Sequence, residues 1–344
     1  MPHKLHITHY TLHLAPYIFT MKSKLTLLFA SFVLLMASCA APATSARTKV
    51  KLPMGYIANV QYAPFYVAAE RGYFAAAGID LEFDYKFETD GVKLVAAGEL
   101  PFAVVSGEQV VLARNQGLPV KYVAQWYHAY PIAVIAPAAS AIKTPADLKG
   151  KTVGLPGLFG ATYVGWRAFL AANGLSEADV KQQEIGFTQA AALQAGKVDA
   201  VVGYVNNEPI VLEQNGFPVK VFAVSDYANM VANGLLTSES VIKQNPQLVK
   251  GMVGALMKGL ADTVKDPDAA MQISTKYVDG LKVDDAIQKK VLLASVKLMQ
   301  PSGGLRPGET TAAAWANTQK VLLGMGQVKT EADVNTFFTN EFLP

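Results

Sequence analysis

Short apolar segments alternate with helical segments that end on glycine, and this alternation constrains the fold more than any other feature of the sequence. Residues 79–85 alternate polar and apolar side chains as a strand does, and residues 102–106 form an apolar run typical of a buried strand. An earlier helical segment opens with Pro64 in its first turn and ends on Gly78. Strands and helices in this order predict an α/β fold with mostly parallel sheets flanked by helices.

The alternation begins again at Thr144, which indicates a second structural unit. Residues 97–117 and 195–216 share a glycine stop, a buried strand, a polar turn with a glutamate and an apolar helix. Chance similarity of two strand-helix units is one explanation, and two lobes of related topology are the other. We expect two lobes joined by a two-segment hinge near 129–133 and 233–236. The expected bounds are 50–130 and 234–344 for lobe one, with the C-terminal helices, and 131–233 for lobe two.

The segment 21–38 has the features of a lipoprotein signal peptide. Two lysines precede an apolar run at 25–36, which is too short to span a bilayer, and small residues lead to Cys39. Cleavage before Cys39 would leave a cysteine that carries acyl chains and anchors the protein to a membrane. The alternative is an ordinary secreted protein whose signal contains a cysteine.

Cys39 is the only cysteine in the chain, so no disulfide can form within it. Residues 39–49 are small and polar and are expected to act as a lipidated tether. Residues 1–20 have no place in such a signal, and we therefore expect them to be a non-native extension before a true start at Met21.

Composition argues against several classes of function. The net charge is +3 and the basic residues are spread along the chain, so nucleic acid is not an expected partner. After the signal region the chain contains one histidine, His128, and no cysteine beyond Cys39, which leaves too few groups for a metal site or a nucleophilic triad. We expect neither a metal, a cofactor nor an enzymatic activity.

Four segments carry a resemblance to a known family: residues 62–83, 92–107, 142–154 and 192–203. In order and spacing they resemble the type II periplasmic-binding-protein superfamily, in the branch of sulfonate, taurine and thiamine-pyrimidine binding proteins. Residues 55–68 and 203–212 are most similar to the riboflavin-binding lipoproteins of bacterial uptake systems. The resemblance implies a monomeric substrate-binding lipoprotein of an ABC importer, on the outer face of the cytoplasmic membrane, with permease and ATPase on separate chains.

In a two-lobed binder of this kind the ligand lies outside the carboxyl ends of the strands, between the lobes. The loops selected by this rule are rich in aromatic and amide side chains and contain neither Lys nor Arg. They suit a flat, uncharged ligand with hydrogen-bonding groups, and riboflavin has both an aromatic ring system and a polyhydroxyl chain. The candidate ligand-binding residues are Tyr56, Asn59, Gln61, Phe65, Tyr66, Ser106, Glu108, Gln109, Trp126, Tyr127, Phe159, Tyr163, Tyr204, Asn206, Asn207 and Glu208.

Three other readings remain open. Glu108 or Glu208 would bind the amine of a thiamine pyrimidine precursor, although both also suit the first turn of a helix without any ligand. The glycine-rich turn at 155–162 would offer amides to a sulfonate or nitrate. A sensor or adhesion lipoprotein would bind no small molecule tightly. Some aromatics also have a structural reading, since Phe65 and Tyr66 open a helix and Trp166 lies a turn inside another.

Overall fold

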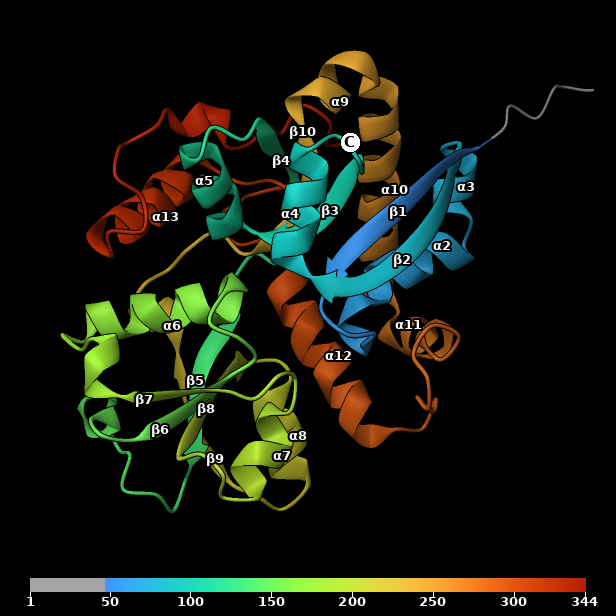
Figure 1. Cartoon of the computed structure of the whole chain (residues 1–344). Helices are drawn as coiled ribbons and strands as arrows, with labels where there is room; N and C mark the ends of the chain where they lie inside the picture. The colour runs from blue at the N-terminus through green and yellow to red at the C-terminus, as the bar shows by residue number, and fades with distance from the viewer. Residues whose placement is uncertain (1–46) are drawn as a thin grey trace, which may run out of the picture. The chain divides into compact units, whose positions relative to one another are not determined.

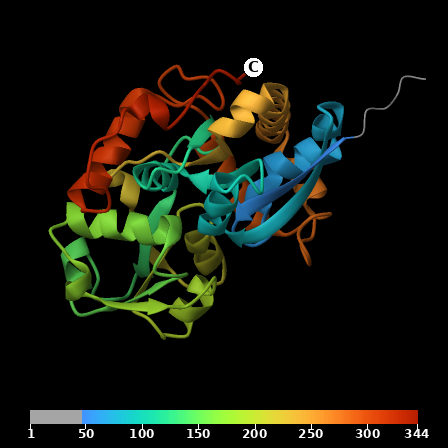
Figure 2. The same ribbon diagram turned by 45° about the horizontal axis from the view of Figure 1, so that its top comes forward.

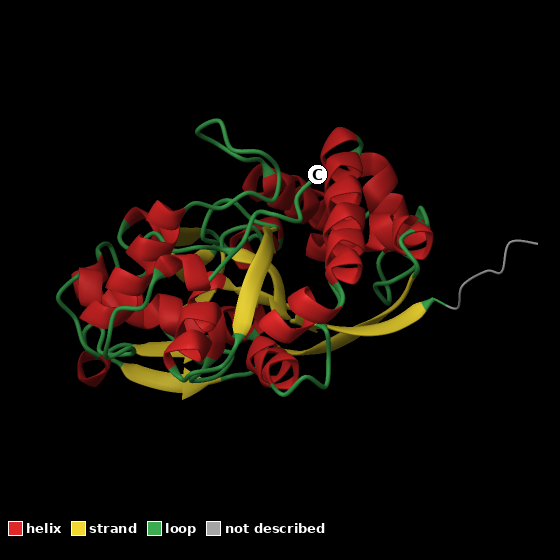
Figure 3. Cartoon of the chain, turned by 90° about the horizontal axis from the view of Figure 1, so that it is seen from above, coloured by secondary structure: helices red, strands yellow, loops and turns green. Residues whose placement is uncertain are grey.

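The computed structural model describes residues 47–344, in which helices flank three sheets (Figures 1 and 3). These residues form one compact unit. The predicted signal peptide, the predicted lipidation of Cys39 and the predicted start at Met21 lie outside the described residues. Among the residues described, none of the helices combines the length and the apolar character that a membrane span requires.

The first sheet pairs two strands in parallel, and the helices between them differ from the expected single helix. Strands β1 (Thr48–Gly55) and β2 (Ile79–Phe87) pair in register from Thr48 opposite Ile79. The helical segment between them divides into α2 (Ala63–Glu70) and α3 (Tyr73–Ala76). Gly72 separates the two helices because its φ of 71° lies in the left-handed region, where glycine is favoured.

A three-stranded sheet continues this part of the fold. Its order is β3 (Phe102–Ser106), β10 (Asn233–Ser238) and β4 (Val120–Gln125), and β10 runs antiparallel to both neighbours. β10 is thus the central strand, although more than a hundred residues separate it from β4 in the sequence. Helices α4 (Glu88–Ala96) and α5 (Gly107–Asn115) pack beside this sheet.

A five-stranded sheet is built from the continuous segment 132–223. Its order is β7 (Lys181–Glu184), β6 (Thr152–Leu155), β8 (Ala200–Tyr204), β5 (Ile132–Pro137) and β9 (Val219–Ala223). β5 runs antiparallel to β8 and β9, whereas β6 is parallel to both of its neighbours. Its helices are α6 (Gly160–Ala172), α7 (Gln189–Gln194) and α8 (Glu208–Gln214).

The structure confirms the α/β class and adds a detail that the strand-helix alternation does not predict. All strands of the five-stranded sheet share one direction except β5, and in the three-stranded sheet only β10 is reversed. Each reversed strand is the first to enter its sheet after the chain leaves the other sheet. When the chain crosses from one sheet to the other without a helix that folds it back, it enters the second sheet from the opposite end. The strand that it then forms runs antiparallel to its neighbours.

The C-terminal region is helical, as its apolar spacing predicts. Its helices are α9 (Glu239–Gln244), α10 (Pro246–Lys265), α11 (Pro267–Ser274), α12 (Ala286–Met299) and α13 (Ala312–Gly324). α10 packs against α2, and α12 contacts α8, which belongs to the five-stranded sheet. α13, red in Figure 2, lies beside α5 and also contacts α6. α13 therefore contacts a helix beside each of the two larger sheets, whereas α12 contacts α8, α10 and α11.

Candidate functional site

A pocket lies where the carboxyl ends of several strands meet, and it encloses about 760 Å³ of empty space, part of it open to solvent. β1, β2 and β4 supply one part of its wall, and β6, β8 and the following loops supply another. The described residues that line the pocket include neither lysine nor arginine.

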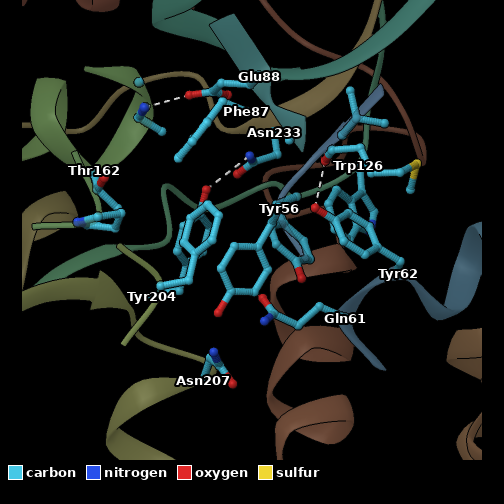
Figure 4. A pocket seen from close by; sticks show the side chains of 18 of the residues that line it. Tyr56, Gln61, Tyr62, Phe87, Glu88, Trp126, Thr162, Tyr204, Asn207 and Asn233 are labelled. Carbon is cyan, nitrogen blue, oxygen red and sulfur yellow. Dashed lines mark hydrogen bonds between the residues drawn. The ribbon is translucent and has the colours of Figure 1, made fainter. Parts of the chain in front are cut away.

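Aromatic rings form much of the lining (Figure 4). Trp126, directly after β4, stacks between Tyr62 and Tyr127, with ring centroids 5.2 Å and 4.1 Å away and interplanar angles of 25° in both pairs. Phe87, at the end of β2, contacts Phe159 edge-on at 4.8 Å. Offset and edge contacts of this kind are the arrangements that aromatic pairs prefer.

Amide, hydroxyl and carboxyl groups complete the lining. The Tyr204 hydroxyl accepts a hydrogen bond from the Asn233 side-chain amide at 3.3 Å, so β8 and β10 meet at the pocket. The backbone N–H of Tyr204 donates to Glu208 Oε2 at 2.7 Å, and Asn207 donates to the other oxygen at 3.2 Å. Burial raises the pKa of Glu208, while these donors act in the opposite direction. The pocket thus offers polar groups without a positive charge.

A buried carboxyl pair lies at one wall of the pocket, and one of its members, Glu88, lines the pocket. Glu88 accepts hydrogen bonds from Ser106 N at 3.0 Å, Ser106 Oγ at 2.9 Å and Ala161 N at 2.5 Å. Ser106 Oγ also makes a short contact with Glu108 Oε1. Burial, followed by the negative charge of Glu88, raises the pKa of Glu108 to about 8. Glu108 is therefore protonated at neutral pH.

Asn206 lies at a buried hydrogen-bonding centre beside the pocket. Its side-chain nitrogen lies 3.0 Å from Gln61 Oε1, 3.2 Å from the Tyr127 hydroxyl and 2.8 Å from Ser295 Oγ. Gln61 and Tyr127 line the pocket, and Ser295 belongs to α12. Asn206 follows β8, so this centre connects the five-stranded sheet with α12.

Half of the residues predicted from the sequence line the pocket. The rule that ligands lie beyond the carboxyl ends of strands explains why, since each of these residues lies at the end of a strand or in the segment that leads from it to the next element. Their role in ligand binding stays a prediction. These residues are Tyr56, Gln61, Trp126, Tyr127, Phe159, Tyr204, Asn207 and Glu208.

The other half lies outside the pocket. Some belong to the core of α2 and its surroundings: Phe65 packs edge-on behind Trp126, and Tyr66 stacks on Tyr277 at 4.7 Å. Asn59 accepts from Gln61 N and caps a short 3₁₀ turn, so its side chain serves the backbone. Tyr163 turns away and donates to Glu177 at 2.7 Å.

The remaining four are buried as polar partners of other side chains. Ser106 and Glu108 belong to the carboxyl network, and Gln109 donates to Glu108 at 3.5 Å. Asn206 belongs to the centre next to Gln61. A side chain near the start of a helix can face the pocket at the end of the sheet or face the protein interior. These four side chains face the interior. Trp166, as its place in α6 indicates, is fully buried in the core.

The sequence reasoning missed several lining residues. Phe87 ends β2 and Glu88 follows it, and Phe187 and Gln189 follow β7. The same rule would have found them if it had been applied to these two strands. Asn233 was placed in the hinge, but its side chain also lines the pocket.

His128 lies outside the pocket lining, in the segment after β4. Its backbone N–H donates to Leu298 O at 2.6 Å, and burial lowers the pKa of its side chain to about 4. Among the described residues no group of three His, Cys, Asp or Glu side chains is arranged to hold a metal ion.

Several curated proteins are similar to this chain. Riboflavin-binding protein RibY from Chloroflexus aurantiacus is 42% identical over 319 residues, which cover 90% of each chain. A formylaminopyrimidine-binding protein from Halalkalibacterium halodurans is 28% identical, over 82% of this chain and 88% of its own. A 4-amino-5-hydroxymethyl-2-methylpyrimidine phosphate synthase from Legionella pneumophila is 22% identical, over 88% and 94%.

The fold also matches solved structures. The alkanesulfonate-binding protein SsuA from Xanthomonas axonopodis pv. citri, bound to MOPS, aligns with a TM-score of 0.65 and 17% identity, over 86% of this chain and 99% of its own. This likeness identifies the periplasmic-binding-protein fold and carries no information on the ligand. The family described as NMT1/THI5 like matches residues 59–270. The chain therefore belongs to the NMT1/THI5-like family.

Proposed function

We propose that this protein is the substrate-binding component of an ABC import system and that it captures riboflavin in the pocket described above. The observation that carries the proposal is a pocket of about 760 Å³, lined by stacked aromatic rings and amide groups and free of lysine and arginine among the described residues. The isoalloxazine ring matches the aromatic lining, and the ribityl chain matches groups such as Gln61 and Asn207. The 42% identity to RibY supports the same ligand.

The protein acts as a binding protein and not as an enzyme. The two binding-protein relatives match at 42% and 28% identity, and the synthase relative matches at 22%. In the described residues His128 is the sole histidine, and it lies outside the pocket lining. Binding alone therefore accounts for the groups that the pocket presents.

The number of heavy atoms in riboflavin sets the affinity that we expect. At roughly 0.3 kcal/mol for each of about 27 heavy atoms, binding would reach about 8 kcal/mol, which corresponds to a dissociation constant near 1 μM or somewhat tighter. Capture involves closure of the two lobes around the ring, because ligand contacts with both walls favour the closed state. The closed form is then presented to a permease, with the ATPase on a further chain.

The proposal includes a lipid anchor at Cys39. The segment 21–38 would direct export and Cys39 would carry acyl chains, so the monomeric protein would work on the outer face of the cytoplasmic membrane. The part of the predicted tether that precedes β1, residues 39–47, would hold the binding unit away from the lipid surface.

A thiamine pyrimidine precursor is the second candidate ligand. Glu208 lines the pocket and is able to accept from an exocyclic amine, and the formylaminopyrimidine-binding relative covers most of the chain. A sulfonate or nitrate is less favoured, because Glu88 already occupies the amide of Ala161 at the start of α6.

A titration of the purified protein with riboflavin tests the proposal. Flavin fluorescence should be quenched as the ring stacks on the aromatic lining, with saturation at micromolar concentration. Formylaminopyrimidine should not displace the flavin at similar concentration. Absence of quenching at tens of micromolar riboflavin, together with saturable binding of the pyrimidine by calorimetry, would transfer the assignment to the second candidate.

A further inference from the structure

Glu88 is held in the pocket wall between two glycines. It is the first residue of α4 and is buried, with 7% of its surface exposed. A Cβ atom added to Gly55 or to Gly160 would lie 3.3 Å from an atom of Glu88. Gly160 also has a φ of 72°, which side chains disfavour. The backbone therefore approaches Glu88 from both sides, and its carboxyl group has a fixed position.

The carboxyl group of Glu88 is bonded to the starts of two helices. Ser106 precedes α5 and donates through its backbone N–H and its hydroxyl, and Ala161 is the second residue of the thirteen-residue α6. Amides at a helix start attract negative charge and are a common place for an anionic ligand group. In this pocket the carboxyl group of Glu88 takes the place of such an anionic ligand group.

Hydrogen-bond geometry assigns the charge of the carboxyl pair to Glu88. Its two oxygens face N–H and O–H donors, so a proton on either oxygen would replace an acceptor where an acceptor is needed. The Ser106 hydroxyl has one proton and cannot donate to both glutamates. The short contact between Ser106 Oγ and Glu108 Oε1 therefore needs a proton on Oε1, which donates to the hydroxyl oxygen while the hydroxyl donates to Glu88. Glu88 is therefore the ionised member of the pair, and Glu108 is the protonated member.

Among the residues that the structure describes, no positive side chain lines the pocket to offset this charge. The described lining residues include a second carboxyl group, Glu208, and the hydroxyl of Tyr204, but neither lysine nor arginine. An anionic ligand group would enter a water-poor space beside Glu88 without a counter-charge, where like charges repel more strongly than in water.

We propose that Glu88 determines the charge specificity of the pocket. Its carboxylate takes the donors of Ser106 and Ala161 that an anionic group would need, so the pocket accepts uncharged riboflavin and rejects riboflavin 5′-phosphate. This inference rests on the proposed function for its ligand. The residue acts by exclusion, which explains how a fold shared with an alkanesulfonate-binding protein presents a pocket for an uncharged molecule.

Paired titrations with riboflavin and riboflavin 5′-phosphate test the proposal. The unchanged protein should bind the phosphate about 100-fold more weakly than riboflavin, and Glu88→Gln should reduce this ratio about tenfold, since glutamine keeps the size and loses the charge. The matched control is Asp90→Asn in the same helix turn, where the carboxylate is exposed and the ratio should not change. Equal binding of both flavins by the unchanged protein, or an unchanged ratio in Glu88→Gln, overturns the proposal.

Sulfate provides a test that does not depend on flavin. Glu88→Ala frees the amides of Ser106 and Ala161, and the variant should gain saturable binding of sulfate at millimolar concentration, measured by calorimetry. Glu88→Gln and Asp90→Asn should show no such gain. If neither flavin binds to the unchanged protein, the proposed function fails, and the sulfate comparison still decides the role of Glu88. A folded Glu88→Ala protein that gains no sulfate binding overturns that role.

Discussion

Asn206 and Ser295 are joined by a hydrogen bond of 2.8 Å between buried side chains, and this bond ties the end of β8 to α12. The same amide nitrogen lies within bonding distance of Gln61 and Tyr127, both in the pocket lining. One buried amide thus links the end of β8, α12 and the pocket lining. These three parts must keep their relative positions when a ligand binds.

Replacement of Asn206 by leucine should weaken riboflavin binding about tenfold, although the residue lies outside the pocket. The change leaves the Gln61 amide and the Tyr127 hydroxyl without this partner, and an unpaired buried polar group costs roughly 1 to 3 kcal/mol. Ser295→Ala should show a smaller effect, because it removes one bond and leaves the other two. Titrations of both variants check the order, and affinities equal to that of the unchanged protein would show that Asn206 does not position the lining.

Trp126→Ala should weaken riboflavin binding at least about tenfold. The indole stacks between Tyr62 and Tyr127, so its removal disorders the aromatic wall as well as removing contact area. Tyr127→Ala should have an effect of similar size. Trp166→Phe is the matched control, since Trp166 is buried in α6 outside the lining. Unchanged affinity in both alanine variants, with the fold intact by circular dichroism, would place the flavin elsewhere.

The Glu108 carboxyl should make stability decline as pH rises. Its pKa in the folded protein is about 8, above the ordinary value of 4.5, so the folded state holds a proton that the unfolded state releases. This contribution is fully present below about pH 4.5 and is lost as pH rises through 8. Between pH 5 and pH 9 the loss should be on the order of 2 to 4 kcal/mol.

Glu108→Gln supplies the control for this pH dependence. Glutamine cannot ionise, so the free energy of unfolding of the variant should fall less between pH 5 and pH 9 than that of the unchanged protein. Urea unfolding at several pH values measures both curves. Two curves of the same slope would assign the pH dependence to other groups.

Two glycines of α10 should respond in opposite ways to alanine. A Cβ atom on Gly259 would lie 2.1 Å from Pro64 O and 2.7 Å from Ala68 Cβ, so Gly259→Ala should destabilise the protein by roughly 2 kcal/mol or more. Gly254 has open space around the same position, and Gly254→Ala should stabilise by about 0.5 to 1 kcal/mol. Thermal unfolding of both variants measures the difference. Equal shifts would contradict close packing of α10 on α2.

Cys39→Ser should release the protein from the membrane. A serine cannot receive the thioether-linked lipid, so the variant should appear in the soluble extracytoplasmic fraction, with unchanged riboflavin affinity. Ser38→Ala keeps a small residue before the cysteine and should leave the protein in the membrane fraction. Cell fractionation and the mass of the N-terminal peptide check both. A lipid-free peptide from the unchanged protein would contradict the anchor.

The sequence predicts the fold well because apolar periodicity and glycine stops are local signals. The candidate site is predicted in part, because proximity to a strand end does not decide side-chain direction. Asn206 and Asn207 are adjacent, yet Asn207 faces the pocket and Asn206 faces α12. Glu88 was missed because β2 extends to Phe87, two residues beyond the expected strand, and brings the next residue to the pocket.

The central position of β10 has a consequence for synthesis of the chain. All strands of the five-stranded sheet come from residues 132–223, so that sheet can be assembled as soon as this stretch has left the ribosome. β3 and β4 are made earlier but do not pair with each other, and each lacks its neighbour until residues 233–238 emerge. Their open edges are meanwhile exposed to unintended pairing. A strand made after the whole five-stranded sheet therefore completes a sheet whose other two strands were made before it.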